Sequence, residues 1–271
     1  MQLGVAGYGV VGRALVRFFS RSGAHTVRIY DKYVEPYNDV QGLRALDDCE
    51  IVFLAVPTPY DIKRGQCDIT ALRELVDKLG VPACIKSTVP PGTTQALMRA
   101  TGRALAFSPE YLGESTTHPW PEIDDCGFAV AGGHPAAVAL VRHAYETAST
   151  KPLRFIETDA TTAELAKYMD NAFLATKIAF VNQFYDLARH AGVDYAELRK
   201  LFVLDPRVGE SHTEVTPQRG FGGKCLPKDL HSILAWAQEG GGAPLLQSLA
   251  AYNDSLRDNA VDAGSPDHQP M

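Results

Sequence analysis

One cysteine is surrounded by residues that could make it a nucleophile, in the stretch RGFGGKCLPKD (219–229). Pro227 is typical of the first turn of a helix, so the spacing predicts that Cys225 lies just outside a helix N-terminus. There the helix dipole and the unpaired N–H groups stabilise an anion, and Lys224 and Lys228 add positive charge. These factors favour the thiolate, which is the reactive form of cysteine. The stretch therefore indicates Cys225 as a candidate nucleophile.

The glycines of this stretch, Gly222 among them, would let the backbone fold closely around a substrate. Asp229 sits in the first turn of the predicted helix, close enough to orient a lysine or a water. The alternative is an inert, buried cysteine beside a glycine loop. The remaining cysteines lack such surroundings, and we interpret them as structural: Cys49, Cys67, Cys84 and Cys126.

A second group of residues has the spacing of a dinucleotide site. GYGVVG (7–12) follows a predicted strand and opens a predicted helix, which is the context that this glycine pattern requires. Gly7 permits a tight turn, Gly9 lets the backbone approach a pyrophosphate, and Gly12 lets the helix pack closely on the strand. Val11 belongs to the same turn. Asp31, 19 residues after Gly12, is placed to accept hydrogen bonds from a ribose 2′-hydroxyl and would repel a 2′-phosphate. The pattern predicts NAD as the cofactor; the alternative is a glycine turn with a surface aspartate.

A nucleophilic cysteine beside NAD indicates a particular oxidation. Oxidising an alcohol to an aldehyde needs no covalent help, whereas oxidising an aldehyde to an acid requires a tetrahedral adduct. A thiolate provides that adduct as a thiohemiacetal, which is oxidised to a thioester that water then hydrolyses. The two groups of residues together predict formation of a carboxylate.

The elements that must position these residues fall into two halves. In the first half, seven short apolar runs alternate with amphipathic segments, such as 11–22, 68–80 and 134–148. This alternation predicts an α/β fold, a Rossmann-type doubly wound parallel sheet with helices on both faces. The predicted strands are 3–7, 26–31, 51–57, 83–89, 104–108, 128–131 and 153–156.

The second half is predicted to be all-helical. Residues 162–190 contain neither glycine nor proline, and TTAE (161–164) has the spacing of a capping box, so we expect one long central helix. Shorter helices are expected at 195–202, 227–238 and 243–258. The predicted domains are an NAD-binding Rossmann domain (1–157), a helical catalytic and dimerisation domain (158–260) and a flexible tail (261–271).

Apolar residues fall on more than one face of the long helix, which favours burial between subunits of a homodimer, although a core helix would look the same. They are Phe173, Ile178, Phe180 and Phe184.

The net charge and the cysteine spacing argue against several classes of partner. The formal net charge of −6 and the pI near 5.7 give no broad electrostatic attraction to nucleic acid or to an anionic membrane. The five cysteines are scattered without a CxxC pair, which argues against a disulfide framework or a metal site and for a reducing compartment. The first residues already have a strand pattern, leaving no room for a signal peptide, and no apolar run approaches the length of a membrane span. We therefore expect a cytoplasmic protein that acts on a small molecule.

Five segments resemble, in the same order, the UDP-glucose/GDP-mannose dehydrogenase family, over nearly all of residues 1–258. They are GYGVVG (7–12), VPTPYD (56–61), STVPPGTT (87–94), SPEYLGES (108–115) and GFGGKCLPKD (220–229). The last resembles the family's GFGGxCxPKD cysteine loop and is the most specific. The resemblance implies that the primary alcohol of a nucleotide sugar is oxidised to a carboxylate with two NAD and a catalytic cysteine.

The resemblance also implies roles for single residues. Cys225 takes the place of the nucleophile. Lys167 and Asn171 in KYMDN match a lysine–asparagine pair that faces the reacting carbon, and their spacing puts both on one face of a helix. Lys167 would stabilise a developing oxyanion, and Asn171 would hold a water or hydroxyl. Asp229 matches an aspartate that positions the lysine or the hydrolytic water. The alternative for the helix pair is a solvated face.

Further matches surround the cofactor and the substrate. Glu110 and Glu114 match loop glutamates near the substrate and the nicotinamide, with Glu114 as a candidate proton acceptor; surface salt bridges are the alternative for both. The other matched positions are the cofactor contacts Thr58, Thr88 and Lys228, and the substrate contact Arg207, which is expected to reach across a dimer.

Three departures from the family pattern concern the substrate. Family members continue after the helix expected at 243–258 into a further domain that grips the nucleotide, so the chain is expected to be a shortened form. Gly113 stands where the family has arginine, and Lys224 replaces a small or aromatic residue. The expected substrate is therefore a sugar or a nucleotide sugar, and the alternative is a second polypeptide that supplies the missing domain.

Two other functions are compatible with the sequence. A β-hydroxyacid dehydrogenase shares the Rossmann and helical halves but performs one hydride transfer with a lysine, and it leaves GFGGKCLPKD unexplained. A non-catalytic NAD-binding partner protein would not need both Cys225 and Lys167.

Overall fold

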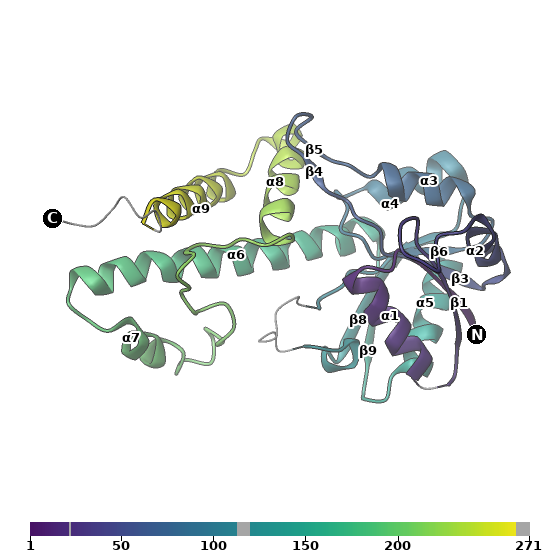
Figure 1. The fold of residues 1–271 in the computed structure, drawn as a ribbon, viewed down its shortest axis with the longest axis horizontal. Helices are drawn as coiled ribbons and strands as arrows, with labels where there is room; N and C mark the ends of the chain where they lie inside the picture. Colours follow the sequence, from purple (N-terminus) through teal and green to yellow (C-terminus); the bar gives the residue numbers. More distant parts are fainter. Residues whose placement is uncertain (22, 113–119, 264–271) are drawn as a thin grey trace. The chain divides into compact units, whose positions relative to one another are not determined.

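The computed structural model describes residues 1–21, 23–112 and 120–263. The chain divides into two compact units, residues 1–167 and 168–271. Helix α6 (Ala160–His190) begins in the first unit and ends in the second (Figure 1).

A seven-stranded sheet forms the centre of the first unit. Its order is β2-β1-β3-β6-β7-β8-β9, and adjacent strands are parallel except β7 and β8. The bounds are β1 Gln2–Ala6, β2 Thr26–Tyr30, β3 Ile51–Leu54, β6 Ala83–Ile85, β7 Leu105–Phe107, β8 Phe128–Gly133 and β9 Arg154–Thr158. The α/β class and the seven predicted strands are confirmed.

The predicted parallel sheet is confirmed except at one pair, because β7 and β8 are antiparallel. A parallel pair needs a crossover connection, usually a helix, to bring the chain back to the same edge. The described part of the connection from β7 to β8 contains only the short helix η2 (Ile123–Asp125), so the chain enters β8 in the opposite direction.

Helices cover both faces of the sheet (Figure 1). Helices α1 (Val10–Arg21) and α5 (Pro135–Ala148) share one apolar core with the strands, and α3 (Thr70–Lys78) and α4 (Thr93–Thr101) share the other. Along β3, alternate residues enter the two cores, which is why the whole strand is apolar. Helix α4, the short helices α2 (Val40–Ala45) and η1 (Leu46–Asp48), and the hairpin β4 (Tyr60–Asp61)–β5 (Gln66–Cys67) are not predicted from the sequence.

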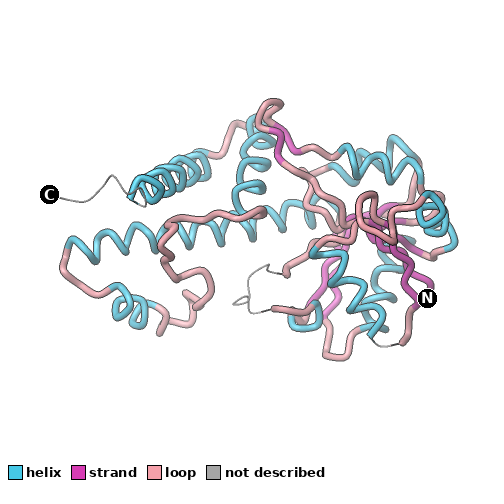
Figure 2. Tube along the Cα trace, in the orientation of Figure 1, coloured by secondary structure: helices cyan, strands magenta, loops and turns pink. Residues whose placement is uncertain are grey.

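The described residues of the second unit contain helices and loops but no strand (Figure 2). After α6 come α7 (Tyr195–Phe202), α8 (Leu226–Ala237), η3 (Gln238–Gly240) and α9 (Pro244–Ala263), which confirms the four predicted helices. The core of this unit contains Ala175, Ala179, Phe221, Leu230 and Leu249. Residues 261–263 of the predicted tail belong to α9, and residues 264–271 lie outside the described residues.

The start of α6 differs from the predicted capping box at 161–164. Asp159 caps this helix instead, because its Oδ1 accepts the N–H of Thr162 at 2.9 Å. Glu164 is fully buried and accepts the N–H groups of Gly92 at 2.6 Å and Thr94 at 2.8 Å, so it caps α4. Burial raises the pKa of Glu164, although these hydrogen bonds oppose the shift. The predicted capping box is therefore wrong.

Within the described ranges, no helix combines the length and the apolar character needed to cross a membrane.

Candidate functional site

The predicted cofactor residues of the first unit gather at the carboxyl edge of its sheet. From β1 the chain passes to β2 on one side and later to β3 on the other, so the strand order reverses at β1. In open α/β sheets, ligands bind in the crevice that such a reversal creates. The glycine turn, Thr58 and Thr88 follow β1, β3 and β6 at this edge.

The three glycines after β1 play different geometric parts. Gly7 has a positive φ of 96°, and a Cβ there would lie 2.4 Å from the carbonyl oxygen of Ala55. A Cβ on Gly12 would lie 1.8 Å from the carbonyl oxygen of Gly7, so α1 packs too closely on this turn for any side chain. A Cβ on Gly9 would meet no atom within 4 Å. The backbone at Gly9 therefore faces open space at the start of α1, where a pyrophosphate fits.

Asp31 lies at the end of β2 and is tied to the glycine turn. Its Oδ2 accepts the N–H of Tyr8 at 2.7 Å, and its Oδ1 accepts the N–H groups of Tyr33 at 2.8 Å and Val34 at 3.1 Å. A carboxylate has about four acceptor sites, so capacity remains for a ribose hydroxyl. The open space at Gly9 and the acceptor at Asp31 together fit NAD.

Thr58 and Thr88 are brought into contact by the segments after β3 and β6. The buried Thr58 donates its hydroxyl hydrogen bond to the Thr88 carbonyl oxygen at 2.7 Å. Ser87 donates to the Val56 carbonyl oxygen at 2.6 Å and ties the same two segments together. Val11 is half-buried in the first turn of α1.

A buried lysine holds Glu110 in the first unit. Lys86 is 4% exposed, and its Nζ lies 2.8 Å from the Tyr145 hydroxyl, 3.2 Å from the Pro109 carbonyl oxygen, 3.3 Å from Ser108 Oγ and 3.4 Å from Glu110 Oε2. Burial alone would lower the pKa of Lys86, but Tyr145 and Glu110 outweigh it and the net shift is upward. Lys86 therefore stays protonated and faces Glu110 as an ion pair.

Glu110 and Lys167 meet the same tyrosine within this unit. Glu110 Oε1 accepts the N–H of Tyr111 at 2.9 Å, and the Lys167 ammonium lies 4.9 Å from the centroid of the Tyr111 ring. Lys167 is only 8% exposed, so the solvated helix face that was its alternative is wrong. Glu114 lies outside the described residues.

Cys225 is the N-cap residue of α8 and is exposed, whereas the other four cysteines are buried or half-buried. Helix α8 begins at Leu226, one residue before the predicted start, so Pro227 is its second residue. Lys224 is exposed beside Cys225. The helix-end location predicted for Cys225 is confirmed.

Asp229 is buried behind the cysteine loop and contacts two predicted site residues. Its Oδ2 accepts a hydrogen bond from Asn171 Nδ2 at 2.5 Å, and its Oδ1 lies 2.7 Å from Lys228 Nζ. Asn171 is 6% exposed. The second unit therefore joins Asn171, Lys228 and Asp229 in one polar cluster at the first turn of α8.

The two other predicted substrate contacts have different surroundings. Arg207 is exposed and pairs with Asp205, Nη2 to Oδ2 at 2.6 Å and Nε to Oδ1 at 3.0 Å. Gly222 is half-buried, and a Cβ on it would lie 2.8 Å from Arg257 Nη1. The Arg257 side chain therefore leaves little room for a side chain at this position.

Three buried polar residues are not predicted from the sequence: Lys86 and two asparagines beside the cysteine loop, Asn182 and Asn253. The available signal for Lys86 is a lysine in the apolar segment ACIKST, since a lysine is almost never fully buried without a partner. For the asparagines, the signal is a polar residue at core-facing positions of two helices.

Comparisons with known proteins agree with this geometry. Residues 37–119 match the model of the NAD binding domain of the UDP-glucose/GDP-mannose dehydrogenase family, and residues 161–255 match the model of its central domain. The first match confirms NAD as the cofactor predicted for the first unit.

Individual relatives point to the same family. The UDP-glucose 6-dehydrogenase of Rickettsia conorii is 32% identical over 217 residues, which cover 74% of this chain and 47% of that protein. The structure of a UDP-glucose dehydrogenase from Pyrobaculum islandicum superposes with a TM-score of 0.78 at 25% identity, covering 95% of this chain and 68% of that one. The structure of a UDP-D-ManNAc dehydrogenase from Pyrococcus horikoshii has a TM-score of 0.78 at 27% identity, covering 97% and 70%.

The chain spans about half the length of the curated relatives first matched. Both matched models describe successive parts of one family. The first falls within the sheet-containing unit, and the second begins at residue 161 and covers most of the helical unit. With the glycine turn and the cysteine loop in the expected places, the chain belongs to the UDP-glucose/GDP-mannose dehydrogenase family.

Proposed function

We propose that this chain oxidises the primary alcohol of a sugar or nucleotide sugar to a carboxylate, with NAD as the electron acceptor and Cys225 as the nucleophile. The observation that carries this proposal is the exposed Cys225 at the N-terminus of α8, in a chain whose family oxidises such alcohols. The helix N-terminus and the exposed Lys224 beside Cys225 favour the thiolate that the reaction needs.

The residues that would hold NAD are the glycine turn and Asp31, with Val11, Thr58 and Thr88 lining the same edge of the sheet. When bound, NAD⁺ accepts the electron pair that leaves the substrate carbon in each of two oxidations.

Cys225 acts between the two oxidations. Its thiolate adds to the aldehyde carbon, so a C–S bond forms and the carbonyl oxygen becomes the oxyanion of a thiohemiacetal. The second oxidation converts this adduct to a thioester. Water then adds to the thioester carbon, the C–S bond breaks, and the acid and the thiol are released. The balance is one alcohol, one water and two NAD⁺ consumed, giving one carboxylate, two NADH and three protons.

Lys167 and Asn171 support these steps from α6. The Lys167 ammonium would stabilise the oxyanion of each tetrahedral adduct. Because Asn171 Nδ2 already donates to Asp229, the amide oxygen is the atom left to accept a hydrogen bond from the hydrolytic water or a substrate hydroxyl. Asp229 thus orients Asn171 and neutralises Lys228. Glu110 and Glu114 are proposed to lie near the substrate, and Glu114 to accept a proton.

Counting products tests the proposal. UDP-glucose, GDP-mannose and UDP-D-ManNAc would be incubated with NAD, and NADH and acid would be counted per sugar consumed. Two NADH per acid are expected, and Cys225→Ser should abolish acid release. One NADH per product would instead indicate a two-electron alcohol or β-hydroxyacid dehydrogenase. NAD binding without any turnover would indicate a non-catalytic partner protein.

A homodimer and a cytoplasmic location are also proposed. Phe173, Phe180 and Phe184 are 61%, 45% and 42% exposed on α6, a larger apolar surface than a solvated helix needs. Covering them with a second copy would bury this surface, and Arg207 would then exchange Asp205 for a substrate in the partner's site. Light scattering should give a dimer for the wild type and a monomer for Phe180→Glu. The five cysteines, all in the described residues and none in a disulfide, support a reducing compartment.

A further inference from the structure

We propose that Asn182 and Asn253 are positioning residues that clamp the backbone of the cysteine loop, defined as residues 219–225, and thereby set the place of the Cys225 sulfur. This inference rests on the proposed function, because the clamp matters for catalysis only if Cys225 attacks the substrate. Neither asparagine lies in the five segments that resemble the family.

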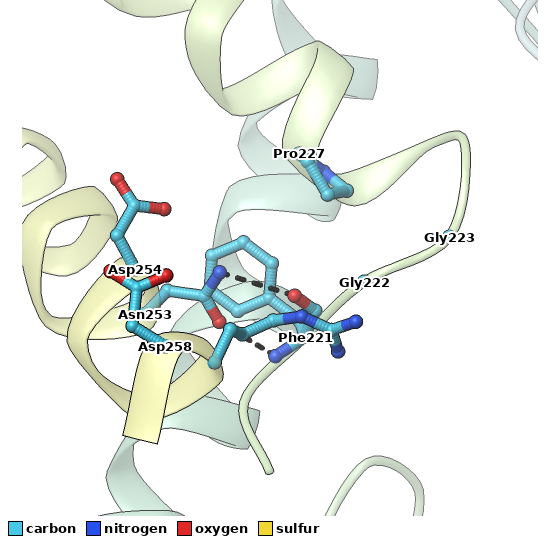
Figure 3. A pocket seen from close by; sticks show the side chains of 8 residues that line it. Phe221, Gly222, Gly223, Pro227, Asn253, Asp254 and Asp258 are labelled. Carbon is cyan, nitrogen blue, oxygen red and sulfur yellow. Dashed lines mark hydrogen bonds between the residues drawn. The ribbon is translucent and has the colours of Figure 1, made fainter. Parts of the chain in front are cut away.

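Asn253, on α9, pairs with both polar groups of one loop residue. Its Oδ1 accepts the Phe221 N–H at 2.7 Å, and its Nδ2 donates to the Phe221 carbonyl oxygen at 3.1 Å (Figure 3). Asn253 is 4% exposed. A planar amide that makes two hydrogen bonds to one residue fixes the position and the orientation of that backbone segment, which a single bond does not.

Asn182, on α6, holds the start of the same loop. Its Oδ1 accepts the Arg219 Nε–H at 2.7 Å and the Gly220 N–H at 3.2 Å, and its Nδ2 donates to the Ile178 carbonyl oxygen at 2.8 Å. The last bond ties the amide to its own helix. Asn182 is 1% exposed, so both the donor and the acceptor of its amide are fixed away from water.

The loop has the backbone shape that such a clamp is needed to maintain. Arg219, Gly220 and Gly223 have positive φ angles of 51°, 55° and 78°. For a non-glycine residue such as Arg219, this conformation costs on the order of 1–3 kcal/mol and persists only where the surroundings hold it. A Cβ on Gly220 would lie 2.5 Å from Asn253 Oδ1, so glycine is required for the amide to approach. The glycine at position 220 therefore leaves the space that the Asn253 amide needs to reach the loop backbone.

The clamp and helix α8 anchor the loop on either side of its exposed part. Phe221 is 3% exposed as a whole residue and belongs to the apolar core of the unit, so its backbone N–H and C=O need partners inside the protein. On the other side, the buried Asp229 fixes the first turn of α8. Gly223, Lys224 and Cys225 are exposed between these anchors. Loosening the Phe221 anchor would release this segment and with it the sulfur.

The test compares Asn253→Ala and Asn253→Asp with Ser255→Ala, a matched change on the same helix. Asn253→Ala removes both hydrogen bonds, and Asn253→Asp keeps the acceptor but places a carboxylate oxygen against the Phe221 carbonyl. Three quantities would be measured in a Cys126→Ser background: the iodoacetamide alkylation rate of Cys225 by peptide mass, kcat for acid formation, and the NAD dissociation constant.

Both Asn253 variants should lower kcat at least roughly tenfold, because misplacement by about 1 Å can cost on the order of 100-fold. The Cys225 alkylation rate should change several-fold, while the NAD dissociation constant stays within about twofold of the Ser255→Ala value, because the residues proposed to hold NAD, apart from Lys228, lie in the first unit. Alkylation and kcat values equal to those of Ser255→Ala would overturn the clamp.

Two further measurements distinguish failure of the clamp from failure of the proposed function and from misfolding of the variants. If Cys225→Ser still forms acid, the proposed function fails, yet the alkylation rate still reports whether the asparagines position the sulfur. If the Asn253 variants do not fold, hydrogen exchange of the wild type decides the question without a variant. The Phe221 amide should exchange as slowly as the core amides of α6, and rapid exchange would contradict the clamp.

Discussion

Replacing Gly9 and Gly12 by alanine separates cofactor binding from folding. A Cβ on Gly9 meets no protein atom within 4 Å, and Gly9 does not have a positive φ, so the free energy of unfolding of Gly9→Ala should change by less than about 1 kcal/mol. The methyl group would occupy the space through which the pyrophosphate approaches the backbone. Inserting a methyl into a closely packed contact costs about 1–3 kcal/mol, which corresponds to roughly 5- to 150-fold weaker NAD binding.

Gly12→Ala should behave differently. Its Cβ would lie 1.8 Å from the Gly7 carbonyl oxygen and 2.9 Å from the Gly7 carbonyl carbon, whereas carbon contacts are favourable at about 3.5–4.0 Å. Helix α1 must move away from β1, so both the free energy of unfolding and NAD binding should fall, the former by about 1–3 kcal/mol or more.

Urea unfolding and calorimetric titration with NAD would be run on both variants and the wild type. Gly9→Ala should lose NAD affinity at wild-type stability, and Gly12→Ala should lose both NAD affinity and stability. Wild-type NAD affinity in Gly9→Ala would refute the assignment of this turn as the pyrophosphate site.

Three further changes test the first unit. Asp31→Ala removes an acceptor for the ribose and for the Tyr8 N–H, and calorimetry should show NAD binding weaker by roughly 10- to 150-fold, the equivalent of about 1.5–3 kcal/mol; unchanged affinity would exclude a ribose contact. Glu164→Gln leaves one of two buried N–H donors unmatched, so urea unfolding should show a loss of about 1–3 kcal/mol. Burial raises the pKa of Glu164 in the folded state, so protonation of Glu164 stabilises the folded protein. This stabilisation is fully present below the unfolded-state pKa and is lost as pH rises through the folded-state pKa. A Gln variant whose free energy of unfolding depends on pH as the wild type's does would contradict this. Lys86→Met leaves Glu110 without its buried partner and should cost about 3–5 kcal/mol in the same assay; wild-type stability would show that the pair is dispensable.

Local patterns in the sequence predicted the parts of the fold whose causes are local. The apolar runs became β1, β2, β3 and β6–β9, the glycine turn became the start of α1, and the absence of glycine and proline over 162–190 became α6. Pro227 placed the start of α8 to within one residue. In each case, neighbouring residues decide the conformation, so a short window contains the information.

Contacts between distant segments account for what could not be predicted. Glu164 has the spacing of a capping box for its own helix, but it caps α4, 70 residues away at Thr94, because that end of α4 is buried beside it. Lys86 stands in a segment with a strand pattern, and only the packing of α5 brings the Tyr145 hydroxyl to it. The antiparallel pairing of β7 and β8 joins Ala106 and Gly133, which are 27 positions apart, and no local pattern sets its direction. The clamp on the cysteine loop joins residues 32 positions apart, Phe221 and Asn253.

The most direct test of the proposed chemistry is the yield of acid and NADH per nucleotide sugar consumed, measured for the wild type and for Cys225→Ser with the same three sugars. A sulfur that carries the substrate between the two oxidations predicts two NADH and one carboxylate for the wild type, and no released carboxylate for the serine variant. Carboxylate released by Cys225→Ser at the wild-type rate would contradict the account.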